Sequence, residues 1–393
     1  MLVSSDRNEI SIAQVWNKNN FLAQLGTVTG GGITIDPTQQ IRRTGTLTIN
    51  SFGLEYDDLV PTNGNSLLHP GSGNEIRLFR GFDYDPMNPG TDIETPPLGV
   101  YRMSKPVVDD QGDQIVITMA VNDRSYLVSR RKWTDAYPIN AGTDLRQAIY
   151  GLIQNRVPDL DLKYKLSLTP GITVPATTFG TDLAGANDPF ADAITLAVVG
   201  PDELFFDYEG ALVLQPPPRA SDGDVSFADV YIEGEDCTYT DIQKTLDETI
   251  TYNGVVVIGV GSGGAPITAE VWDTDPTSPL YIGANGENKM GFYYQTTLVP
   301  SYGQQPAQAQ AQLFKIAVAL YMQVHTLLDI PNLTAPPNAA LQESDVLNLV
   351  RNRVGLSGPY VCGQIQMPFD YATQMSVTMR SPVVVLPTGT VLE

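Results

Sequence analysis

Two histidines are the first residues to weigh, because histidine ionises near neutral pH and is the commonest metal ligand. His69 stands beside a Pro-Gly turn, and His325 lies in a segment with helical spacing. Neither has a second histidine or a cysteine nearby at the spacing that metal sites use. We therefore expect neither side chain to be catalytic or to bind a metal.

A glycine-rich segment, GVGSGG at 259–264, matches the GxGxxG pattern that binds dinucleotide phosphates. That mechanism needs a helix to begin at the third glycine, so that the helix N-terminus meets the pyrophosphate. Here the chain continues as APITAEVWD, which alternates as a strand does. The segment is predicted to be a hairpin tip, and no cofactor is expected.

Adjacent acidic residues raise the question of calcium binding or of paired catalytic carboxylates. The candidates are Asp57-Asp58, Asp109-Asp110 and the segment 273–279. None has the ligand spacing of a calcium loop, and in a chain with 44 acids such pairs arise by chance. The sequence also contains no nucleophile elbow and no catalytic Cys–His arrangement. The chain is therefore predicted not to be an enzyme, and no metal site is expected.

One local basic run, Arg130, Arg131 and Lys132, is followed by Trp133. It is too small and too isolated in this acidic chain to be a nucleic-acid patch. Arginine and tryptophan are enriched at interfaces, so the run is predicted to pair with acids across a domain or subunit boundary. Arg130, Arg131 and Trp133 are accordingly the predicted subunit-interface residues.

The charge balance limits the partners of the chain. Of 393 residues, 44 are Asp or Glu and 23 are Lys or Arg, which gives a formal net charge of −21. Such a surface repels phosphate and anionic membranes, so tight nucleic-acid binding and membrane insertion are not expected. Charge alone does not decide between simple solubility and a surface past which DNA slides without sticking.

The two cysteines, Cys237 and Cys362, are expected to be free thiols, because a disulfide-stapled secreted protein uses more of them in a shorter chain. The N-terminus lacks the basic and apolar regions of a signal peptide. The longest apolar stretch is far too short to span a membrane.

The elements that would position these residues are mostly strands. Alternating apolar and polar residues at 33–35, 44–49, 73–82, 97–108 and 113–125 predict antiparallel strands in a first β domain, 1–133. Two helices are predicted within an inserted subdomain, 134–201: one over 145–157, capped by Thr143 or Asp144, and one over 188–200, capped by Asp188.

Two further segments complete the predicted order. A connecting hairpin and linker is expected at 202–245, ended by three prolines. A second β domain is expected at 246–393, with a helix over 307–328.

Several phrases, taken in order, resemble a known family. They are RRTGTLTI (42–49), GNEIRLFRG (73–81), PLGVYRM (97–103), VNDRSYLVSRRKW (121–133), TYNGVVVIGVG (251–261), AEVWDTDPTSPLYIG (269–283) and the segment 306–323. The ordered set resembles the minor tail proteins, or baseplate hub proteins, of siphophages that infect actinobacteria. That family is similar to the baseplate hubs of contractile-tailed phages.

The resemblance implies a mainly β fold with α+β insertions, containing two tube-like antiparallel β-barrel domains and smaller inserted domains. It implies a homotrimer whose ring joins the six-fold tail tube to the three-fold tip, with DNA in transit through the lumen. The implied partners are the tail tube or distal tail protein, other tail tip proteins and the tape measure protein. The implied location is the tail tip of the virion, after synthesis in the host cytoplasm.

A receptor-binding or carbohydrate-binding tail tip module is the alternative interpretation, since β-rich acidic domains also do that work. It requires exposed aromatic clusters, and Phe292-Tyr293-Tyr294 is the one place where aromatic residues bunch together. Sugar binding at that segment would distinguish the two interpretations.

Overall fold

We analysed a computed structural model of the chain. It describes residues 8–25, 28–50, 60–83, 93–112, 114–160, 162–166, 173–181, 187–200, 202–216, 230–232, 239–246, 252–260, 266–296, 306–324, 329–370 and 373–382. These residues form a mainly β structure with α+β parts, which confirms the predicted fold class.

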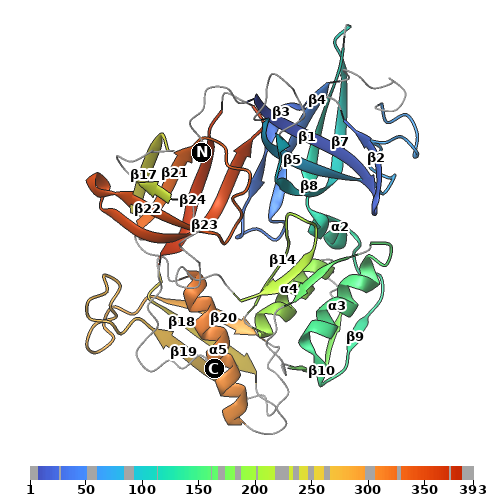
Figure 1. The fold of residues 1–393 in the computed structure, drawn as a ribbon. Coiled ribbons are helices and arrows are strands. Elements are labelled where there is room, and N and C mark those ends of the chain that lie inside the picture. Colours follow the sequence, from blue (N-terminus) through green and yellow to red (C-terminus); the bar gives the residue numbers. More distant parts are fainter. Residues whose placement is uncertain are drawn as a thin grey trace.

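A large antiparallel sheet dominates the molecule (Figure 1). Its first half contains β1 (Asn8–Asn17), β2 (Asn20–Gln24), β3 (Val28–Ile35), β4 (Arg43–Asn50), β5 (Glu75–Asp83), β6 (Ile93–Glu94), β7 (Pro97–Asp110) and β8 (Ile115–Asn122). Alternation drives these strands, as in β4, where Leu47 and Ile49 are buried on one face and Thr46 is exposed on the other. The predicted strands of 1–133 are therefore present.

The second half of the sheet comes from the C-terminal part of the chain. It contains β16 (Val230–Ile232), β17 (Asp241–Leu246), β21 (Asp329–Ala335), β22 (Val346–Arg351), β23 (Leu356–Pro368) and β24 (Met375–Pro382), with a 3-10 turn, η1 (Asn352–Val354), between β22 and β23. The long path through the whole sheet runs β17-β21-β24-β23-β3-β4-β8-β7-β5-β1-β2.

The two halves meet where β23 pairs antiparallel with β3, from Ile365 opposite Ile35 to Pro368 opposite Gly32. One cluster of buried side chains spans both halves. Glycine makes the close approach possible, because a Cβ on Gly32 would lie 2.9 Å from the carbonyl oxygen of Met367. The strands of the two expected β domains are thus joined in one continuous sheet, and their division into two tube-like domains remains a prediction.

An α/β unit lies beside the first half and has a separate core. It contains α2 (Arg124–Arg130), β9 (Tyr137–Ile139), β10 (Thr143–Asp144), α3 (Leu145–Arg156), β11 (Tyr164–Leu166), β12 (Thr173–Val174), β13 (Thr177–Phe179), α4 (Pro189–Val199), β14 (Glu203–Phe206) and β15 (Leu212–Gln215). As the sequence predicts, Asp144 caps α3 and Asp188 caps α4 through their side-chain oxygens.

The hairpin of β14 and β15 belongs to this α/β unit by packing. Leu204, Phe206, Leu212 and Leu214 are buried in the same cluster as the apolar faces of α3 and α4. The sequence places that hairpin in a connecting segment, 202–245, because its prolines mark an end; the shared core becomes visible only in three dimensions. The domain limits themselves remain predictions.

A third unit consists of β18 (Gly254–Val260), β19 (Pro266–Trp272) and β20 (Gly291–Thr296), with α5 (Pro306–Val324) on one face (Figure 1). The helix predicted over 307–328 therefore exists over 306–324, and 325–328 lie outside the described residues. His325, Cys237, Asp57-Asp58 and most of GVGSGG also lie outside them.

No helix among the described residues is long and apolar enough to cross a membrane.

Candidate functional site: the ionic junction

Buried ion pairs join three parts of the molecule: the first half of the large sheet, its second half and the α/β unit. We call this set of ion pairs the ionic junction. Its charged members are Arg42, Arg43, Glu75, Arg124, Glu203, Glu343 and Arg380. They come from both halves of the sheet and from the α/β unit.

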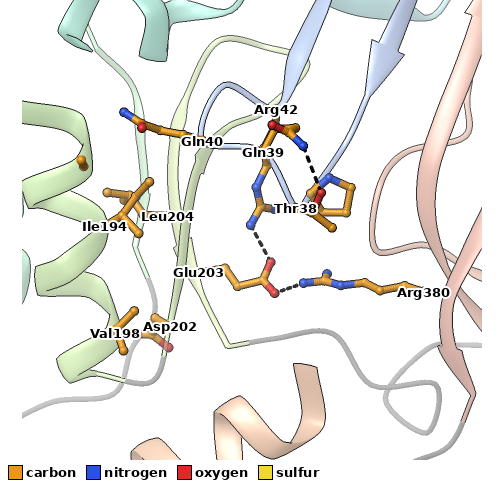
Figure 2. Close-up of a pocket in the computed structure, with 12 residues that line it drawn as sticks. Thr38, Gln39, Gln40, Arg42, Ile194, Val198, Asp202, Glu203, Leu204 and Arg380 are labelled. Carbon is orange, nitrogen blue, oxygen red and sulfur yellow. Dashed lines mark hydrogen bonds and ion pairs between the residues drawn. The ribbon is translucent and has the colours of Figure 1, made fainter. Parts of the chain in front are cut away.

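Glu203 is the centre of one cluster. Its carboxylate accepts a hydrogen bond from Arg42 at 2.8 Å and another from Arg380, so one residue of β14 is bound to both halves of the sheet (Figure 2). Its side chain is only 4 % exposed. Burial acts to raise the pKa of Glu203, but the charges of Arg380 and Arg42 outweigh burial and lower the pKa below its usual value.

Arg43 links the two halves of the sheet directly. Its guanidinium pairs with Glu343 and donates to the Gln342 side chain at 2.8 Å and to the Leu98 carbonyl at 3.0 Å. Its backbone N–H donates to Asp123 at 2.9 Å. The arginine at the start of β4 thus fixes the loop before β22 against β7.

Arg124 links the first half to the α/β unit. It donates twice to Glu75 of β5, at 2.9 and 2.7 Å, and once to the carbonyl of Gly210 at 2.6 Å. Asp123 caps the helix that carries it, accepting from the backbone of Ser125 at 2.8 Å. Burial raises the pKa of Asp123 above its usual value, although those hydrogen bonds and the charge of Arg43 act in the opposite direction.

This arrangement is suited to holding geometry. Desolvating charges costs free energy that pairing only partly returns, so buried pairs contribute more to a unique arrangement than to net stability. Arginine forks are directional and bind carboxylates in defined planes. We conclude that the ionic junction fixes the relative orientation of the three parts.

A pocket of about 380 Å³ opens beside Glu203. Its lining consists of Pro37, Thr38, Gln39, Gln40, Arg42, Ala191, Ile194, Val198, Asp202, Glu203, Leu204 and Arg380 (Figure 2). Burial raises the pKa of Asp202 to about 6. Two cations and two carboxylates in one wall give the pocket no strong preference for an anion or a cation.

The predicted interface residues are largely engaged within the chain. Trp133 is 5 % exposed; its indole N–H donates to Asp192 at 2.7 Å, and its ring stacks on Tyr137. Arg131 pairs with Asp159 at 2.5 Å, while Arg130 is exposed and lies over the ring of Tyr126.

The ring of Trp133 is packed in the core of the α/β unit, and its part in a domain or subunit boundary remains a prediction. A contribution of the exposed Arg130 and the half-exposed Arg131 to a subunit interface remains a prediction.

Other sequence candidates lie apart from the junction. His69 accepts a hydrogen bond from the backbone of Gly71 at 3.0 Å, and Cys362 is buried. Asp109 and Asp110 are exposed near the end of β7. Among the described residues no group of three His, Cys, Asp or Glu side chains is placed to hold a metal ion.

Side chains alternate between the two faces of β20, so the three neighbouring aromatic residues at 292–294 do not form one cluster. Phe292 and Tyr294 pack towards α5, and Tyr293, which is 70 % exposed, points to the opposite face. On the side away from the helix, Trp272 lies across Gly254, where a Cβ would come within 2.0 Å of the ring. The ammonium of Lys289 lies 4.3 Å from the centre of that ring.

Sequence reasoning missed the ionic junction, although several of the phrases that carry the family resemblance contain its members. RRTGTLTI contains Arg42 and Arg43, GNEIRLFRG contains Glu75, and VNDRSYLVSRRKW contains Asp123 and Arg124. Charged residues inside otherwise alternating strands were the available signal. Their partners Glu203 and Glu343 stand in segments that gave no such signal.

The fold of this chain is similar to the folds of tail and prophage tail proteins of known structure. The chain is similar to a tail protein from Neisseria meningitidis, with a TM-score of 0.60, 9% identity, and coverage of 95% of this chain and 97% of that one. It is also similar to a 43 kDa prophage tail protein from Shewanella oneidensis, with a TM-score of 0.58, 12% identity and coverage of 95% and 99%.

A third similar structure is a prophage tail protein from Listeria monocytogenes, with a TM-score of 0.50, 11% identity and coverage of 95% of each chain. No protein-family model and no curated protein sequence matches the chain. At these identities the likeness is one of fold, and it extends over nearly the whole length of each chain.

Proposed function

We propose that this chain is a structural subunit of a phage tail, located at the tail tip as its hub. Three copies would form a ring that joins the six-fold tail tube to the three-fold tip and lets DNA pass through the lumen. The observation that carries the proposal is the fold shared with tail proteins over 95% of this chain. No catalytic role is proposed.

The ionic junction suits that role. A ring subunit must keep its sheet halves and its α/β unit in fixed orientation, so that copies around the ring meet at the same angles. Glu203 and Arg43 bind parts that are far apart in the sequence, and both side chains are almost completely buried.

The acidic composition suits a DNA channel. A lumen that carries excess carboxylates repels the phosphate backbone and allows transit without binding. We propose that acidic residues concentrate on the channel face of the assembled ring. A ring structure with its charge spread evenly over all faces would contradict this.

The proposed partners are the tail tube or distal tail protein, other tail tip proteins and the tape measure protein. The host group suggested by the sequence resemblance, actinobacteria, and a siphophage tail are part of the proposal. So is synthesis in the host cytoplasm before assembly.

Gold labelling of intact particles with an antibody against this chain tests the location. Label at the tail tip, increased when the tip is partly opened, is the expected result in negative-stain electron microscopy. Label along fibres would favour receptor binding, and opened particles without label would overturn the tail assignment.

A carbohydrate-binding role is the second candidate, favoured by one feature: Tyr293 is 70 % exposed on the sheet face that also carries Trp272. Stacking of sugar rings on such side chains would require Lys289 to leave the Trp272 ring. A glycan array probed with the whole chain and with Tyr293→Ala tests it. Binding lost in the variant would support this candidate, and the hub proposal expects no binding by either protein.

A further inference from the structure

One carboxylate of the pocket beside Glu203 has no partner within the part of the chain that the structure describes. Asp202 lines the pocket and is only 7 % exposed, and its side chain forms no hydrogen bond and no ion pair there. Burial alone raises its pKa, without a contribution from a neighbouring charge. A buried carboxylate without a partner costs free energy whenever it is ionised. Asp202 is therefore a polar group that the fold itself does not satisfy.

The other charged groups of the pocket are bound to one another. Glu203 accepts hydrogen bonds from Arg42 and from Arg380. Figure 2 shows Glu203 pointing towards these two arginines, whereas Asp202 lies beside Val198 of α4. The charges of the pocket balance as a whole, but the unpaired negative charge lies at its α4 end.

Asp202 also stands at the C-terminal end of α4. The helix ends at Val199 with Gly200 as its C-cap, and the backbone N–H of Asp202 donates to the Ala197 carbonyl at 3.2 Å. A Cβ on Gly200 would lie 3.3 Å from Oδ2 of Asp202, so the carboxylate is close to the helix end. The last turn of α4 contains no basic residue. Because a helix C-terminus carries partial negative charge, the carboxylate and the helix end together favour a cation.

The walls of the pocket determine which kind of cation fits. Ile194 and Val198 of α4 provide an apolar wall, and Gln39 and Gln40 are exposed in the loop between β3 and β4. The volume of about 380 Å³ is in the range of small-ligand sites. Among the described residues no group of three His, Cys, Asp or Glu side chains could hold a metal ion. The walls therefore suit an organic cation with a hydrocarbon stem.

We propose that this pocket is a binding site for an aliphatic ammonium group, carried by a lysine side chain or by a free alkyl amine. The ammonium pairs with Asp202 at the end of α4, and the carbon chain lies along Ile194 and Val198. The pocket is lined by all three parts that the ionic junction joins, so a bound ligand bridges them. The inference goes beyond the proposed tail role and does not depend on it.

Isothermal titration calorimetry of the full-length chain tests the site with three probes. They are n-butylamine, Nα-acetyl-lysine methylamide and Nα-acetyl-norleucine methylamide, which has a similar stem without the charge. We expect both amines to bind, and the norleucine derivative to bind at least about ten-fold more weakly than the lysine derivative, because it cannot form the charged hydrogen bond.

Two variants and a change of pH locate the binding group. Asp202→Asn should weaken binding of the lysine derivative by about ten-fold or more. Asp109→Asn removes the same charge from an exposed site and should leave the affinity unchanged. Because the pKa of Asp202 is about 6, protonation competes with the ligand, and the affinity of the wild type should fall about ten-fold from pH 7 to pH 5.

Three results would overturn the site: no binding of either amine, equal binding of the lysine and norleucine derivatives, or equal binding by the wild type and Asp202→Asn. Where the site is present, the two amines distinguish the source of the ammonium. Tighter binding of the lysine derivative assigns a polypeptide, because its amide groups then contact the exposed Gln39 and Gln40. Equal or tighter binding of n-butylamine assigns a free amine.

Discussion

A single carboxylate of the ionic junction can neutralise more than one arginine. Glu203 faces Arg42 and Arg380 at once, so its charge offsets two guanidiniums, and its side chain is only 4 % exposed. Removing one partner of a buried ion pair leaves an uncompensated charge, and that penalty exceeds what the pair itself contributes. A substitution that tests the ionic junction should therefore replace the carboxylate and leave the arginines in place.

We expect Glu203→Gln to lower the free energy of unfolding by about 3–5 kcal/mol, because the buried Arg42 and the partly buried Arg380 lose their counter-charge. Urea unfolding followed by tryptophan fluorescence measures it. Glu209→Gln is the control: this carboxylate pairs with Lys165 at the surface, where such pairs contribute less than about 1 kcal/mol. Equal losses in the two variants would refute a special role for Glu203.

The stability contributed by Asp202 should change with pH in the opposite direction to that contributed by a carboxylate in an ordinary ion pair. Its pKa is raised from 3.8 to about 6, so between these values the folded state binds the proton more tightly than the unfolded state does. Stability from this group therefore falls as pH rises from about 4 to 6 and stays reduced above 6.

Asp202→Asn removes that penalty. Its free energy of unfolding should match that of the wild type near pH 4 and exceed it by about 1–2 kcal/mol at pH 7, after allowance for solvent screening. Urea midpoints measured across this pH range provide the difference curve. Asp109→Asn, at an exposed site, should produce a flat curve. A variant less stable than the wild type at pH 7 would show that the ionised carboxylate has a stabilising partner.

Elements were predicted well where the signal was local. Alternation predicts β3, β4, β5, β7 and β8 but not β1, β2 or β6. The cap of α4 was predicted as Asp188, and that of α3 as one of two neighbours, of which Asp144 is the cap. What the sequence did not reveal depends on contacts between distant segments. The pairing of β3 with β23 joins residues more than 300 positions apart, and Glu203 and Arg380 become neighbours only because of it. The sequence of neither segment contains a pattern that identifies the segment with which it pairs.

The β3–β23 joint supplies an element-scale prediction. Gly32→Ala places a Cβ 2.9 Å from the Met367 carbonyl oxygen, so the strands must separate, and we expect a loss of about 1–3 kcal/mol. Thermal unfolding measures it. Gly64→Ala is the control, since nothing lies within 4 Å of the added atom, and the change should be neutral or slightly stabilising. Equal stability of the two variants would show that the joint adjusts without cost.

At the scale of the whole molecule, the continuous sheet and the net charge act together. Among the described residues, the longest path through the sheet ends at β2 and at β17, and β6 and β16 are further terminal strands off that path. Between those ends the ionic junction links the two halves through Arg43–Glu343 and through Glu203 with Arg42 and Arg380. The −21 charge then applies to every copy, so a ring of three would surround its axis with a strongly negative field.

That field predicts how the protein behaves with DNA. We expect no binding of duplex DNA even at about 0.01 M salt, where the screening length is about 30 Å and any attraction would be greatest. Fluorescence anisotropy of a labelled DNA duplex measures this binding. The duplex is titrated first with the unassembled chain and then with assembled rings. A basic DNA-binding protein is the positive control under the same conditions. Binding that weakens with rising salt would reveal a phosphate-binding surface, because release of counterions produces that slope. A channel with such a surface would hold DNA in transit, and the acidic-lumen proposal would then be wrong.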